Sequence, residues 1–126
     1  MLSSRRAFVI GATALCATAP LTGCVRGTED PAKSRRFSTF LTTLLAGKTQ
    51  PTGMDDAMQR ALTPNRILEI RHTFAPFGTF QRLQFLGEDE VQGYRRYHYI
   101  AIFSQGKQGT LFVLDSLGKI GGFFEE

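Results

Sequence analysis

Tyr94-Arg-Arg-Tyr-His-Tyr-Ile-Ala-Ile-Phe-Ser104 is the stretch that decides the fold, because its side chains change in character with a period of two. Successive side chains of a β-strand point to opposite faces of the sheet. One face would carry Tyr97, Tyr99, Ala101 and Phe103, and the other Tyr94, Arg96, His98 and Ile100. The stretch therefore predicts a long strand whose two faces meet different surroundings.

Three further β-rich runs accompany this strand, at residues 80–86, 110–115 and 120–124. The segments between the four runs each contain glycine and are short enough for hairpins. They cover residues 88–93, 105–109 and 115–119. The order predicts a four-stranded antiparallel meander.

Helical periodicity comes before the strands. From Ser34 one stripe of a 3.6-residue period runs until Gly47, which is suited to end a helix. A short helix is expected at residues 55–62, and Thr63 and Pro64 read as the N-cap and first position of another, which ends at residues 76–78. Helices followed by strands, without alternation, predict an α+β fold with the N-terminal helices packed on one face of the sheet. The apolar stripe of the first helix consists of Phe37, Phe40, Leu41, Leu44 and Leu45.

These elements together carry a resemblance to a known superfamily. The residues concerned are the spacing Phe-x-x-Phe-Leu-x-x-Leu-Leu-x-Gly, then Phe77-Gly-Thr-Phe80, Tyr97-x-Tyr-x-Ala-x-Phe103, Leu111-Phe-Val-Leu-Asp115 and Gly118-Lys-Ile-Gly-Gly-Phe123. Residues 34–126 resemble the cystatin-like α+β superfamily that includes nuclear transport factor two. Within it they are similar to a short domain of unknown function, found alone in exported bacterial proteins and also preceding serine hydrolases and penicillin-binding-type enzymes. The resemblance implies helices over a sheet whose interior is a ligand pocket, an active site or a packed core.

The first 23 residues have the layout of an export signal. A basic start with Arg5 and Arg6 is followed by an apolar run over residues 7–15 and then by small and turn-forming residues. That run is shorter than the roughly 20 residues needed to cross a bilayer. It is typical of a secretory signal peptide, which is removed from the mature protein.

Leu21-Thr22-Gly23-Cys24 closes this segment and resembles the lipobox of bacterial lipoproteins. By that resemblance Cys24 is acylated and becomes the first mature residue, with Leu21 and Gly23 serving the peptidase. The alternatives are an ordinary signal peptide cut near Ala17 or Ala19, or a poor membrane anchor.

Ser4-Arg5-Arg6-Ala7-Phe8-Val9 also resembles the twin-arginine motif read by the machine that exports folded proteins. The paired arginines beside Phe8 fit that motif, whereas Ile10 stands where a polar residue often follows. Paired arginines in an ordinary signal only orient it. The general and the twin-arginine routes therefore both stay open.

Removal of the signal changes what the composition implies. Cys16 would leave with it and Cys24 would be acylated, so no free thiol would remain for a disulfide, a metal site or a nucleophile. The net charge of +4 falls to +2, because 13 Lys and Arg then face 11 Asp and Glu, which is too mild to indicate nucleic acid. The mature chain would be a polar tether at residues 24–33 and one domain at residues 34–126.

Candidate catalytic groups are sparse in this domain. The two histidines, His72 and His98, lack the spacing of a metal site, no nucleophile motif is present, and Glu69 with His72 reads as a solvated helix pair. Neither a metal nor a cofactor is expected. The outer strand face, with Tyr94, Arg96 and His98, is instead the candidate contact for a partner.

Two classes of function remain open. The first is a lipid-anchored, exported accessory or binding module of the cell envelope, without chemistry of its own. It would be held to the membrane through Cys24, on the outer membrane facing the periplasm if the cell has two membranes, and would bind a cell-envelope protein or a cell-wall polymer. The alternative is a small enzyme or apolar-ligand carrier of the cystatin-like kind, with a cavity between helices and sheet.

Overall fold

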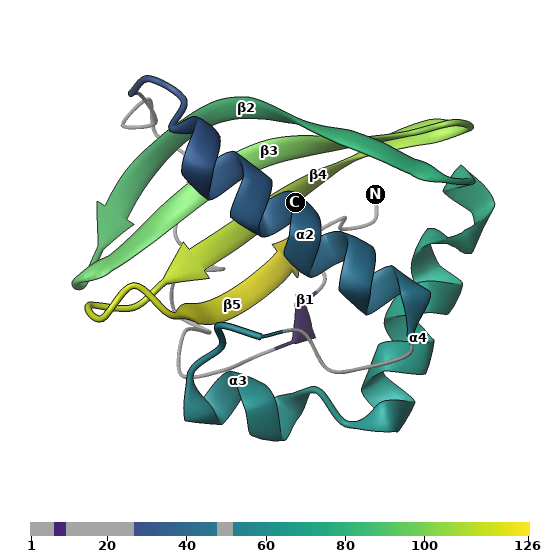
Figure 1. The fold of residues 1–126 in the computed structure, drawn as a ribbon, viewed down its shortest axis with the longest axis horizontal. Coiled ribbons are helices and arrows are strands. Elements are labelled where there is room, and N and C mark those ends of the chain that lie inside the picture. Colours follow the sequence, from purple (N-terminus) through teal and green to yellow (C-terminus); the bar gives the residue numbers. More distant parts are fainter. Residues whose placement is uncertain (1–6, 10–26, 48–51) are drawn as a thin grey trace.

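The computed structural model describes the backbone of residues 7–9 and the whole of residues 27–47 and 52–126. Three α-helices precede a long antiparallel sheet, so the α+β class is confirmed. Figure 1 shows the first of these helices running diagonally across one face of the sheet, with the third beside its end and the second near the last strand.

Helix α2 (Pro31–Ala46) has both ends defined by its sequence. The Asp30 carboxylate caps the N-terminus by accepting a hydrogen bond from the Ala32 N–H at 3.0 Å. Gly47 ends the helix in a left-handed conformation, with φ of 69°. The helix begins three residues before the predicted start at Ser34, because the Asp30 cap and Pro31 already form its first turn.

The next helices follow the predicted caps closely. Asp55 caps α3 (Asp56–Ala61) and Thr63 caps α4 (Pro64–Phe74), each accepting from a backbone N–H three residues on. A single 3₁₀ turn, η1 (Ala75–Phe77), then leads into the sheet. None of the described helices has the length and apolar character needed to cross a membrane.

Four strands form the predicted meander. They are β2 (Phe80–Val91), β3 (Tyr94–Phe103), β4 (Gly106–Leu114) and β5 (Ile120–Glu125), each paired antiparallel with the next.

Two of the expected loops are shorter than predicted. Residues 88–91 belong to β2, and the turn to β3 is only Gln92-Gly93, both with positive φ as a two-residue hairpin turn requires. Residues 106–109 likewise belong to β4. The expectation that residues 88–90 belong to the segment between two strands was therefore wrong, since they pair with β3.

A short fifth strand, β1 (Ala7–Val9), lies at the free edge of β5. Its backbone pairs antiparallel, with Ala7 opposite Phe124 and Val9 opposite Phe123. The strand falls inside the apolar run predicted to be a signal peptide. A cleaved chain would lose β1 and leave β5 as an edge strand.

Aromatic rings fill the space between α2 and the sheet. Phe37 has no exposed surface and stacks on Phe112 with ring centroids 4.6 Å apart. Its ring also lies 5.4 Å from that of Tyr97 and 5.8 Å from that of Tyr99. The predicted aromatic face of β3 therefore forms the core.

Truncation of Phe37 tests how much this packing contributes. Phe37→Ala should lower the free energy of unfolding by about 3 to 5 kcal/mol, because it removes buried apolar area and leaves a cavity. Urea denaturation would measure it, with Thr42→Ala on the exposed side of the same helix as the control, expected within about 0.5 kcal/mol of the parent chain. Similar losses in both variants would show that the stack does not hold α2 in place.

Candidate functional site

The predicted export and lipidation residues lie largely outside the described part of the structure. This holds for Arg5, Arg6, Leu21, Gly23 and Cys24. Phe8 lies in β1, where only the backbone is described. The anchor therefore stays a prediction from sequence.

The candidate partner residues Tyr94, Arg96 and His98 share the face of β3 that points away from the helices. Arg96 and His98 are each only 1 % exposed, whereas Tyr94 is half-buried. Their strand neighbours Tyr97 and Tyr99 point into the core on the opposite side. The predicted division of this charged and aromatic stretch between two faces is thus confirmed.

Arg96 and His98 belong to a buried ionic network. Asp89, directly across from Arg96 on β2, accepts from its Nε at 2.7 Å and also from its Nη2. His98 lies between two carboxylates, with Nδ1 3.0 Å from Glu126 Oε1 and Nε2 3.4 Å from Asp89 Oδ1. A bidentate arginine–carboxylate pair of this kind is strong and directional.

The network lowers the pKa of Asp89. Burial alone would raise the pKa of its carboxyl group, but the hydrogen bonds and positive charge of Arg96, assisted by His98, outweigh burial and hold the pKa below its ordinary value of 3.8. Asp89 is therefore ionised throughout the physiological pH range.

The arrangement is poorly suited to acid–base catalysis. Both ring nitrogens of His98 face carboxylate oxygens, so neither is directed at a place where a substrate proton could lie. Within residues 27–47 and 52–126, no three His, Cys, Asp or Glu side chains are grouped to hold a metal ion. The network is better suited to fixing the shape of the sheet face that points away from the helices than to catalysis.

A small apolar cluster adjoins the network on the same side of the sheet. Leu111, Val113 and Phe124 form its buried centre, and the half-buried Val91 and Tyr94 pack against it. These described members come from the strands alone, whereas the helices pack into the larger core. Apolar and charged groups are thus combined on the face where sequence analysis placed a partner contact.

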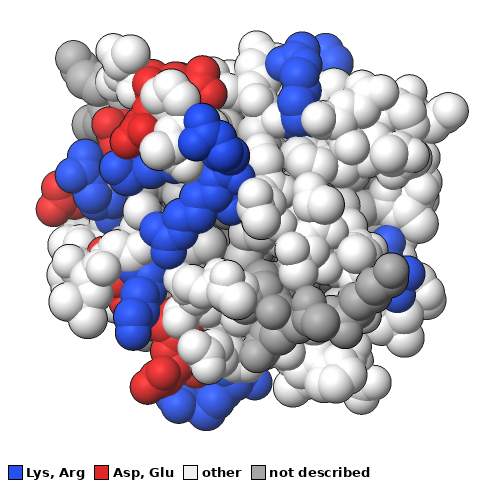
Figure 2. Space-filling view, in the orientation of Figure 1, with Lys and Arg blue, Asp and Glu red and all other residues white. Residues whose placement is uncertain are grey.

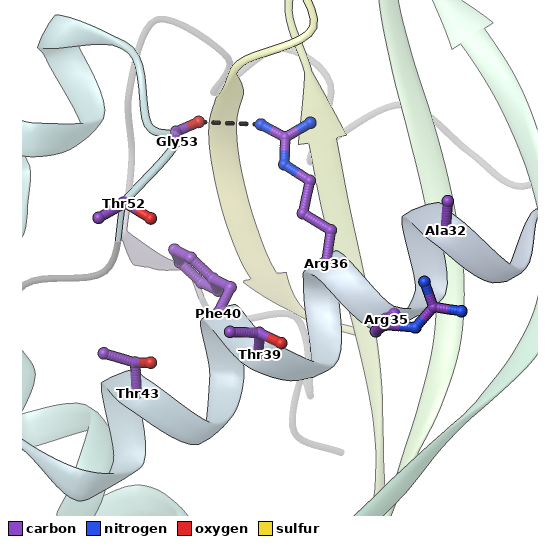
Figure 3. A pocket seen from close by; sticks show the side chains of 8 residues that line it. All are labelled: Ala32, Arg35, Arg36, Thr39, Phe40, Thr43, Thr52 and Gly53. Carbon is purple, nitrogen blue, oxygen red and sulfur yellow. Dashed lines mark hydrogen bonds between the residues drawn. The ribbon is translucent and has the colours of Figure 1, made fainter.

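The other side of the molecule carries a groove along α2, with a volume of about 340 Å³. Figure 3 shows Arg36 reaching across from the helix, where its Nη2 donates to the Gly53 carbonyl oxygen at 3.1 Å. Arg35, from the same helix, turns away from that bond in this view. None of the described lining residues is a carboxylate or a histidine that could serve as an acid or a base; they are Ala32, Arg35, Arg36, Thr39, Phe40, Thr43, Thr52 and Gly53.

A second hollow, of about 280 Å³, lies beside α4 and contains His72. Arg71, also in its lining, donates from Nε to the Leu45 carbonyl oxygen at 3.0 Å. Glu69 was expected to pair with His72. Its Oε1 instead lies 3.2 Å from Nη1 of Arg66, three residues earlier on the same helix.

A third hollow, here named the Tyr97 pocket, was not predicted from the sequence. It measures about 220 Å³ and opens between the start of α2 and strands β2 and β3. Figure 2 shows side chains of both charges gathered on the side of the molecule where α2 begins, while much of the opposite half is uncharged. The pocket is lined by Thr28, Asp30, Lys33, Phe85, Glu88, Arg95, Tyr97 and Tyr99.

Comparison of the chain with protein-family models, with curated proteins and with solved structures gave no match. The cystatin-like resemblance therefore stays a prediction, and function has to be argued from the residues themselves.

The pH dependence of stability tests the network around Asp89. Because the pKa of Asp89 is lowered in the folded chain, its contribution is complete above the unfolded value of 3.8 and is lost as the pH falls through the folded value. Asp89→Asn, which removes the carboxylate charge that pairs with the buried Arg96, should cost about 3 kcal/mol at pH 7. The loss should shrink below pH 3.8.

Urea denaturation between pH 7 and pH 2 would measure this difference. Asp56→Asn, at an exposed position of α3, is the matched control and should change stability by about 0.5 kcal/mol or less. A loss for Asp89→Asn that is the same at every pH would contradict the assignment.

Proposed function

We propose that this chain is a lipid-anchored, exported accessory or binding module of the cell envelope, without chemistry of its own. The observation that carries the proposal is the lipobox-like Leu21-Thr-Gly-Cys24, which follows a basic start and an apolar run. The fold is compatible with it, because α2 begins at Pro31 and an acylated Cys24 would lie only a few residues before it.

Two features favour a module over an enzyme. His98 has both ring nitrogens engaged by carboxylates, and the groove along α2 lacks an acid or a base. A general base has to reach the proton it removes, and a nucleophile needs such a base beside it. The described residues do not bring such a pair together in either place.

The partner surface in this proposal is the strand face that carries Tyr94, where the buried Arg96 and His98 hold the shape of the face and do not themselves contact the partner. Removal of residues 1–23 would also free the edge of β5 beside Phe124. Free edges and mixed apolar and charged faces are where extended segments of other proteins bind. The partner is a cell-envelope protein or a cell-wall polymer, and not nucleic acid.

The membrane in question would be the outer one, facing the periplasm, if the cell has two. Val25 follows the cysteine at the position where the sorting pattern for inner-membrane retention uses aspartate.

Replacement of the acylated residue tests the anchor. Cys24→Ser should block processing and move the protein from the membrane to the soluble fraction, because none of the described helices could hold it in a bilayer. Cys16→Ser is the matched control, since it removes the other cysteine of the chain and leaves the lipobox intact. Cell fractionation followed by immunoblotting would show whether each variant is in the membrane or the soluble fraction. Membrane retention of the Cys24→Ser chain would overturn the proposal.

One observation favours a ligand site, although for a small polar ligand and not for the apolar one that the alternative reading of the sequence expects. The Tyr97 pocket contains a buried hydroxyl group that the described part of the chain leaves without a hydrogen-bond partner.

A further inference from the structure

The Tyr97 hydroxyl is an unusual group for the interior of a domain. Tyr97 is only 3 % exposed, and within the described residues its hydroxyl oxygen has no hydrogen-bond partner. An unmet buried hydroxyl costs free energy, so such groups are nearly always bonded. The neighbouring Tyr99 shows the ordinary situation, because its hydroxyl lies 2.8 Å from Ser34 Oγ.

The charges around this hydroxyl are those that line the pocket. Burial raises the pKa of Tyr97, while the cations of Lys33 and Arg95 lower it and the carboxylates of Glu88 and Asp30 raise it. Tyr97 and all four charged residues line the same pocket. Because the net shift is upward, the hydroxyl keeps its proton at neutral pH and can donate a hydrogen bond.

The four charges form two pairs that a ligand can share. Lys33 Nζ lies 3.1 Å from Asp30, and Arg95 Nη2 lies 3.2 Å from Glu88. Surface pairs of this kind contribute little to stability, so rearranging them around a ligand costs little. The two cations and two carboxylates give the pocket lining no net charge. This suits a ligand that carries one positive and one negative group and is neutral overall.

We infer that the Tyr97 pocket binds a small zwitterion, whose oxyanion accepts from the Tyr97 hydroxyl beside Lys33 and Arg95 and whose primary ammonium group faces Asp30 and Glu88. At about 220 Å³ the pocket is smaller than the 300–1,000 Å³ range of drug-sized ligands, so the bound group is small. Two sources supply this chemistry. One is a free amino acid, and the other is the phosphoethanolamine headgroup of a membrane lipid.

The position of the pocket makes the lipid source accessible. Thr28 and Asp30 line it and follow Cys24 by only a few residues, so an acylated chain would hold the pocket near the membrane surface. The lipid source rests on the proposed anchor, whereas binding of a free zwitterion does not. The binding experiment therefore uses the full chain with Cys24→Ser, which makes its outcome independent of acylation.

Calorimetric titration with glycerophosphoethanolamine, a phosphodiester like the lipid headgroup, and with β-alanine measures binding. Ethanolamine and propionate, which each carry one of the two charges, are the control ligands and should bind at least tenfold more weakly than the zwitterions. Tyr97→Phe should lower the affinity about tenfold or more, because it removes one hydrogen bond to a charged group. The same variant should unfold at the same urea concentration as its parent or a higher one, since no bond within the described chain is lost.

Thr110→Val is the matched control. It removes a buried hydroxyl that donates to the Tyr99 carbonyl oxygen at 3.3 Å and that is not part of the pocket lining, so it should unfold at a lower urea concentration and keep the affinity for the zwitterion within about twofold. Co-sedimentation with vesicles separates the two sources. If the chain binds phosphatidylethanolamine vesicles better than phosphatidylglycerol vesicles, and this binding depends on Tyr97, the ligand is the lipid headgroup. If the chain binds β-alanine but shows no such preference between the vesicles, the ligand is a free zwitterion.

Three results would overturn the inference. They are failure of both zwitterions to bind, equal affinity of the Tyr97→Phe chain, and a clear loss of stability in that variant. The last would show that the hydroxyl is already satisfied within the protein.

Discussion

The seating of α2 on the sheet through Phe37 is the contact on which the rest of the domain depends. The Phe37 ring stacks on Phe112 of β4 and touches the rings of Tyr97 and Tyr99 of β3, so one side chain joins the helix to two strands. The same seating brings Ser34 to the Tyr99 hydroxyl. One turn before Phe37, Lys33 of α2 lies over the Tyr97 ring, and the Tyr97 pocket opens there.

The opposite face of the sheet is held by ion pairs as well as by apolar packing. Arg96, His98, Asp89 and Glu126 form an ionic network next to a small apolar cluster. Buried ion pairs add little net stability compared with apolar packing, although breaking one is costly. Here the ion pairs fix the shape of this face of the sheet, because each residue holds its neighbour in one orientation. A face so defined is suited to recognising a partner, which agrees with the module we propose.

The sequence was sufficient for the elements that depend on local periodicity and caps. The stripe around Phe37 and the Thr63 cap predicted their helices, and the alternation after Tyr94 predicted the two faces of β3. The pairing of Asp89 was missed because Gln92-Gly93 is a weaker hairpin signal than Asn-Gly. The unmet Tyr97 hydroxyl could not be predicted, since it depends on how a distant helix is seated.

We expect residues 1–23 to serve export and not to be needed for the fold, although β1 pairs with β5 in the full chain. Urea unfolding of a chain that begins at residue 24 with Cys24→Ser, compared with the full chain, tests this claim directly. We expect cooperative unfolding with a free energy within about 1 kcal/mol of the full chain, because the described members of the core around Phe37 all lie within residues 37–123. A shortened chain that is unfolded or several kcal/mol less stable would contradict it.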